Sequence, residues 1–147
     1  MSSIAKLLTA PIQPKAEADR VLELAFLMSA VDGHLADEEV EAFRELVGLA
    51  RGVAPTKDEV DGLIEQFVVA AHAVGVDERV RHVARAIRKD LREDAFKIAV
   101  GLSLVDHDES EHEDELIGIL AATMELAERA IPLAREARAA VRADEGE

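Results

Sequence analysis

Two stretches of the chain place carboxylates after an apolar run in the same order, and these carboxylates are the residues best suited to chemistry. The first run ends at Asp32, and Glu39 follows seven residues later; the second ends at Asp106, and Glu113 follows at the same spacing. Each aspartate falls where a helix should end, beside exposed carbonyl oxygens and the negative end of the helix dipole. An acidic residue is unfavourable there, so its repetition indicates a role other than stability. Cation binding is the simplest such role.

The second stretch is densely acidic, since the segment from Asp106 to Glu115 reads DHDESEHEDE. Carboxylates gathered in one turn repel one another unless solvent, salt or a cation offsets their charge. Hard cations such as Ca²⁺ and Mg²⁺ prefer oxygen ligands, which carboxylates and helix-end carbonyls supply. The predicted metal ligands are Asp32, Glu39, Asp106, Asp108 and Glu113.

A plainer interpretation of the same carboxylates stays open. Glu39 and Glu113 each fall at the third position of a predicted helix, where a glutamate can simply close a capping box. The remaining acidic residues would then form exposed loops. An EF-hand does not fit, because Glu111 stands where the Ca²⁺ loop needs glycine and Ile117 where it needs a bidentate glutamate. The sequence therefore leaves Ca²⁺, Mg²⁺, Mn²⁺ and Zn²⁺ all open as the bound ion.

Around these turns, helical periodicity predicts an all-α, single-domain bundle of about seven helices. The first and fifth helices are apolar on nearly all faces, as expected of buried central helices. Each is followed by an acidic turn and an amphipathic helix, so the fold contains an internal helix–acidic turn–helix repeat. The predicted layout is an N-terminal arm over residues 1–15, a helical domain over 16–143 and a frayed tail over 144–147. The helices are expected at 16–31, 37–51, 56–75, 77–90, 93–105, 110–126 and 131–142.

Composition and charge exclude several classes of function. The net charge of −14 opposes binding to nucleic acid and to anionic membrane surfaces. Cysteine is absent, which excludes disulfides, thiolate catalysis and cysteine-based metal sites. Nucleophile and phosphate-loop motifs are missing, so a non-enzymatic protein is expected. The apolar runs are too short to span a membrane, and Pro11 and Pro14 interrupt any signal-peptide core, so we expect a cytoplasmic protein.

Four arginines recur at helical spacing in and beyond the predicted helix 77–90: Arg81, Arg85, Arg88 and Arg92. Two interpretations stay open for this arginine face. It can be a solvated face paired with carboxylates nearby in the sequence, which is the usual condition of charged helix faces. Alternatively, it can hold the acidic turns of the same chain or of a partner.

The paired motifs resemble the TerB-like family, which includes the tellurite-resistance protein TerB and the N-terminal part of some membrane-linked DnaJ-type co-chaperones. The first motif reads Val-Asp-Gly-His-Leu over 31–35, and the second reads Val-Asp-His-Asp-Glu over 105–109. The resemblance spans roughly residues 16–130. The second copy departs from the family pattern, because His107 replaces a glycine and Glu109 replaces an apolar residue. A J-domain His-Pro-Asp signature is missing, so co-chaperone activity is not expected.

The resemblance implies an all-helical bundle, a divalent-metal site at the acidic turns and a link to stress or metal-oxyanion resistance. The leading hypothesis is a non-enzymatic bacterial stress-response protein that binds a divalent cation and acts as a sensor or scaffold for a protein partner. The alternative is a metal-independent module whose acidic turns recognise basic partners. A metal-dependent enzyme would need an enclosed pocket and an open coordination position. The partner, the oligomeric state and the sharing of one ion between both turns are not fixed by the sequence.

Overall fold

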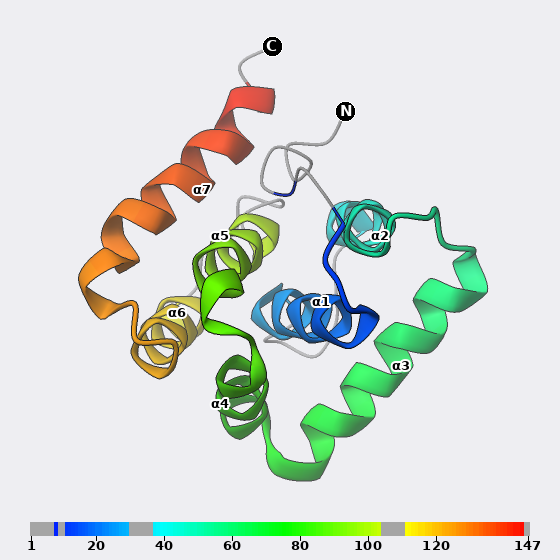
Figure 1. Cartoon of the computed structure of the whole chain (residues 1–147), viewed down its shortest axis with the longest axis horizontal. Helices are drawn as coiled ribbons and strands as arrows, with labels where there is room; N and C mark the ends of the chain where they lie inside the picture. The colour runs from blue at the N-terminus through cyan, green and yellow to red at the C-terminus, as the bar shows by residue number, and fades with distance from the viewer. Residues whose placement is uncertain (1–7, 9–10, 30–36, 104–110, 146–147) are drawn as a thin grey trace.

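The fold is all-α throughout the part of the chain that the computed structural model describes, namely residues 8, 11–29, 37–103 and 111–145. Side chains are described for residues 8, 11–29, 40–102, 115 and 117–140. Within these ranges seven α-helices and two short 3₁₀ turns follow one another without a strand (Figure 1). In chain order they are α1 (Lys15–Ser29), α2 (Asp37–Arg51), α3 (Lys57–Val74), α4 (Val76–Ala86), η2 (Lys89–Leu91), α5 (Arg92–Ser103), α6 (Glu111–Thr123), η3 (Ala127–Arg129) and α7 (Ala130–Glu145).

Helices α1 and α5 lie side by side at the centre of the bundle, and the other helices surround them (Figure 1). In α1 every residue from Val21 to Ser29 is buried. In α5 every residue from Ala95 to Leu102 is buried except Lys97. Helices buried on all faces cannot show a narrow apolar stripe, which is why their sequences are apolar nearly all round. The prediction that the first and fifth helices form the centre is confirmed.

A cluster of three aromatic rings joins α1, α2 and α3 beneath the surface. Phe26 of α1 lies 6.1 Å from Phe43 of α2 and 5.8 Å from Phe67 of α3, measured between ring centroids. Phe43 and Phe67 are 6.4 Å apart and meet edge to face, a favoured geometry for aromatic pairs. All three side chains are at most 3% exposed, so the cluster fixes how the first three helices pack.

Both ends of α3 follow signals that the sequence carries. At its start the Thr56 hydroxyl oxygen accepts a hydrogen bond from the Glu59 backbone N–H at 3.2 Å, which is the interaction of an N-cap. At its end Gly75 adopts a φ of +91°, a conformation that residues with a Cβ atom rarely adopt. The predicted helix over 56–75 is confirmed, with Thr56 and Gly75 as the residues that flank its two ends.

The predicted helix over 77–90 is too long, because α4 ends at Ala86. The backbone of Ile87 is extended, with φ −74° and ψ 134°, while its side chain is 1% exposed in the core. The extended residue leaves carbonyls at the end of α4 without helical partners. Arg92 donates hydrogen bonds to two of them, the Ile87 oxygen at 3.2 Å and the Arg85 oxygen at 3.4 Å. The expected continuous arginine face is therefore wrong beyond Arg85.

The sixth helix is also shorter than predicted, since α6 ends at Thr123 rather than at residue 126. Glu125 has a positive φ of 62°, which breaks the helix, and η3 then leads into α7. Pro132 lies in the first turn of α7, where its missing N–H would have had no helical partner.

Candidate functional site

The acidic turns fall largely outside the described residues. Asp32, Asp106 and Asp108 lie in segments that the structure does not describe. Glu39 and Glu113 are placed by their backbones as the third residues of α2 and α6, while their side chains are also outside the description. The structure therefore shows where the helices that flank each turn begin and end, and the predicted ligand set stays a prediction.

The helices that lead into the two turns begin at the same end of the bundle. Glu17, in the first turn of α1, accepts a hydrogen bond from the backbone N–H of Arg88 at 3.3 Å. Arg88 precedes α5 by a few residues, and its guanidinium also donates to the Gln13 carbonyl oxygen at 2.9 Å. Since α1 and α5 start at the same end of the bundle and pack side by side, both helices also end together. Their C-terminal residues, Ser29 and Ser103, lie at the opposite end of the bundle.

The helices that follow the turns are arranged in a matching way. Helix α2 packs against both α1 and α5, and α6 likewise packs against both α5 and α1. Each of these two helices thus contacts both central helices. The internal repeat seen in the sequence therefore corresponds to two pairs of helices, α1 with α2 and α5 with α6, that share one core.

A comparison with known protein families matches the part of the chain that contains both helix pairs. The model of the family described as tellurite resistance protein TerB matches residues 18–136, from the first turn of α1 into α7. The chain belongs to the TerB family. Neither the curated proteins nor the solved structures that were compared gave a match. None of the helices in the described part of this TerB-family chain has the length and apolar character to cross a membrane.

A buried ion pair fixes the central helix of this TerB fold to α4. Glu23 of α1 is only 7% exposed and accepts two hydrogen bonds from the Arg79 guanidinium, at 2.5 Å and 3.0 Å. The hydrogen bond to Glu23 raises the pKa of Arg79 above its ordinary value, although burial acts in the opposite direction. Sequence analysis missed this pair. The signal was a glutamate between Leu22 and Leu24 in the apolar part of the helix, because a buried charge requires a partner.

Two further carboxylates of α1 also have arginine partners. Glu17, which is 6% exposed, pairs with Arg20 at 2.5 Å. Asp19 accepts hydrogen bonds from Arg51 of α2 at 2.9 Å and 3.2 Å, which ties the start of α1 to the end of α2. These carboxylates hold helices together. Among the side chains that the structure describes, no group of three His, Asp or Glu residues could hold a metal ion.

The arginine face has the pairing expected of a solvated surface at two positions. Arg81 contacts Glu78 at 2.7 Å, and Arg88 contacts Asp90 at 3.0 Å. These are pairs between neighbours in the sequence, as one of the two interpretations predicted. Glu93, another carboxylate close to these arginines in the sequence, pairs instead with Arg129 at 3.0 Å and links α5 to η3.

Proposed function

We propose that this TerB-family protein binds a divalent cation at its two acidic turns and acts as a non-enzymatic sensor or scaffold in the bacterial stress response. The observation that supports the proposal is the common direction of α1 and α5, whose C-terminal ends lie at the same end of the bundle. Asp32 and Asp106 follow the ends of these two helices in the sequence. Carboxylates from both halves of the repeat can then act on one ion or on two neighbouring ions.

The chemistry of the donor set fits a hard cation. Asp32, Glu39, Asp106, Asp108 and Glu113 supply oxygen ligands only, as Ca²⁺, Mg²⁺ and Mn²⁺ prefer. Zn²⁺ also accepts carboxylate oxygen, although nitrogen and sulfur ligands suit it as well. A bound cation would reduce the repulsion among these carboxylates and join the two units at their acidic ends.

A sensor role follows from the position of the turns between buried and amphipathic helices. A bound ion would favour one arrangement of α2 and α6 against the two central helices. In this proposal, a protein partner recognises that arrangement. The TerB family is generally not enzymatic, which agrees with a binding role.

A thermal melt tests the cation directly. Each of Ca²⁺, Mg²⁺, Mn²⁺ and Zn²⁺ is added separately, and an ion at a hundred times its dissociation constant should stabilise the fold by about 2.7 kcal/mol. For a domain of this size that corresponds to a rise in Tm of roughly 5–11 °C. The double variant Asp32→Asn/Asp106→Asn should lose the rise. Asp61→Asn is the matched control, because Asp61 also precedes a glycine but is exposed within α3.

The alternative function has a distinct outcome in the same experiment. If none of the four ions raises Tm at millimolar concentration, the turns do not hold a cation and the proposal is wrong. The acidic segments would then serve as a metal-independent module for basic protein partners. A rise that persists unchanged in the double variant would place the ion elsewhere on the chain.

A further inference from the structure

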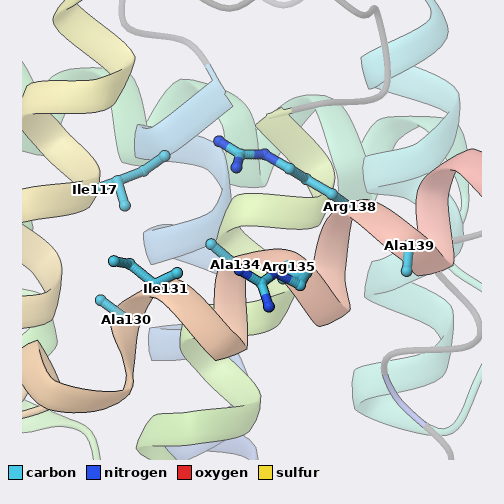
Figure 2. A pocket seen from close by; sticks show the side chains of 7 residues that line it. All are labelled: Ile117, Ala130, Ile131, Ala134, Arg135, Arg138 and Ala139. Carbon is cyan, nitrogen blue, oxygen red and sulfur yellow. The ribbon is translucent and has the colours of Figure 1, made fainter.

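An open groove runs between α6 and α7, on a different part of the molecule from the central helices (Figure 2). Its volume is about 510 Å³. Ile117 of α6 and Ile131 of α7 form an aliphatic side, while Arg135 and Arg138 of α7 line the groove farther along the helix (Figure 2). This volume lies within the range of small-molecule sites in proteins, which is roughly 300–1,000 Å³.

The groove exposes apolar surface, chiefly at Ile131, beside residues such as Ile117 that also pack against the core. Ile131 is 72% exposed, the highest value among the large hydrophobic side chains that are exposed in the described chain. Alanines on α7, including Ala130 and Ala134, line the groove with small side chains. An aliphatic group that entered the groove would cover Ile131 and Ile117 and remove their surface from water.

The groove also carries positive charge in a strongly acidic protein. Arg135 and Arg138 are three residues apart on α7, so they share one face of the helix. Arg135 is exposed, and no ion pair joins it to any side chain that the structure describes. The chain as a whole carries a net charge of −14. The groove therefore combines positive charge and aliphatic surface, although the protein as a whole is strongly negative.

We propose that this groove binds an aliphatic carboxylate, with the hydrocarbon chain against Ile117 and Ile131 and the carboxylate on Arg135. Guanidinium groups hold carboxylates through paired, charge-assisted hydrogen bonds. Arg138 lines the same groove and adds positive charge beside the head group. None of the residues that line the groove is one of the predicted cation ligands, so binding there should not depend on the cation.

Both parts of the ligand contribute to affinity, and their joint effect distinguishes the proposed site from non-specific hydrophobic binding. The net negative charge of the protein repels a bare anion, and screening at physiological salt limits this repulsion to about 8 Å. A short anion gains nothing from the isoleucines, and a neutral chain gains nothing from Arg135. Affinity should therefore be highest for a ligand that has both a hydrocarbon chain and a carboxylate.

Titration of the full-length protein with octanoate, followed by amide chemical shifts in two-dimensional NMR, tests the site. Saturable shifts are expected at Ile117 and over residues 130–139. Affinity should rise by up to roughly fourfold for each methylene that the groove buries, so octanoate should bind more tightly than hexanoate. Acetate, which lacks the hydrocarbon chain, should produce no saturable shift at these residues. Octanol, which lacks the carboxylate, should bind roughly twofold to fivefold more weakly than octanoate.

Matched variants assign the binding to particular side chains. Arg135→Gln should weaken octanoate binding by roughly twofold to fivefold, the range of an exposed charge pair. Arg85→Gln removes the same charge from an exposed position of α4 and should leave affinity unchanged. Ile131→Ser should weaken binding, whereas Val69→Ser, at a residue 63% exposed on α3, should not. Shifts spread over the whole protein, octanol bound as tightly as octanoate, or full affinity in Arg135→Gln would each overturn the proposal.

Discussion

Replacing either partner of the buried Glu23–Arg79 pair should destabilise the fold, but by different amounts. The Glu23 side chain is 9% exposed, whereas that of Arg79 is 27% exposed. If Arg79 is replaced by methionine, the Glu23 carboxylate stays buried on the central helix without its partner. If Glu23 is replaced by glutamine, the Arg79 guanidinium can still reach water. Removal of the arginine should therefore destabilise the fold more than removal of the glutamate charge.

The expected sizes follow from the burial of each group. Loss of one partner of a fully buried pair costs about 3–5 kcal/mol, and the partial exposure of Arg79 lowers this to about 2–4 kcal/mol for Arg79→Met. Glu23→Gln keeps the volume and one acceptor oxygen, so its cost should be about 1 kcal/mol. The double variant Glu23→Leu/Arg79→Met leaves no buried charge and should recover most of the loss.

Urea denaturation measures these differences as changes in the midpoint at a constant m-value. Arg81→Met is the control, because Arg81 lies on the same helix in an exposed pair with Glu78 and should change stability by at most about 1 kcal/mol. Equal losses for Arg79→Met and Glu23→Gln would refute the reasoning. So would a double variant that is less stable than Arg79→Met.

The raised pKa of Arg79 fixes the sign of the pH dependence of the same pair. A group whose pKa is higher in the folded state contributes its full stabilisation below its unfolded pKa and loses it only as pH rises through the folded value. For an arginine both values lie far above neutrality. The arginine side of the pair should therefore contribute equally at neutral and at mildly alkaline pH, which the urea measurement repeated at both conditions checks.

Two further substitutions test the packing of the surrounding helices. Phe43→Ala removes a fully buried ring that contacts both Phe26 and Phe67, and it should reduce the free energy of unfolding by about 3–5 kcal/mol in the urea assay. Thr56→Ala removes the N-cap of α3 and should cost about 1 kcal/mol in the same assay, while Thr56→Ser should retain most of the stability because serine can accept the same hydrogen bond.

Features set by neighbouring residues could be predicted from the sequence. The limits of α2 and α3 and the burial of α1 and α5 follow from periodicity, a cap at Thr56 and a glycine at position 75. The end of α4 could not be predicted in this way. Ile87 continues the helical spacing of apolar residues, yet packing places its side chain in the core from an extended backbone. The contacts that Arg92 makes with freed carbonyls depend on this tertiary arrangement.

The same distinction between local and tertiary features applies to the candidate site. The ligand types and their spacing were evident from the repeat, because both are local properties of the chain. The common direction of α1 and α5 was not, because it depends on the hydrogen bond from Arg88 to Glu17, residues that lie far apart in the sequence. Only the fold brings the ends of these two helices to one end of the molecule.

The pairing of carboxylates elsewhere bears on the acidic turns themselves. On α1, the carboxylates of Glu17, Asp19 and Glu23 each contact an arginine, so the protein neutralises its carboxylates in and around the core with its own side chains. The segments 32–39 and 106–115 contain no lysine or arginine. Local sequence therefore cannot neutralise their charge as it does that of Glu17 by Arg20. The compensating charge must come from distant arginines, from solvent ions or from a bound cation, and the cation titration distinguishes the last of these from the others.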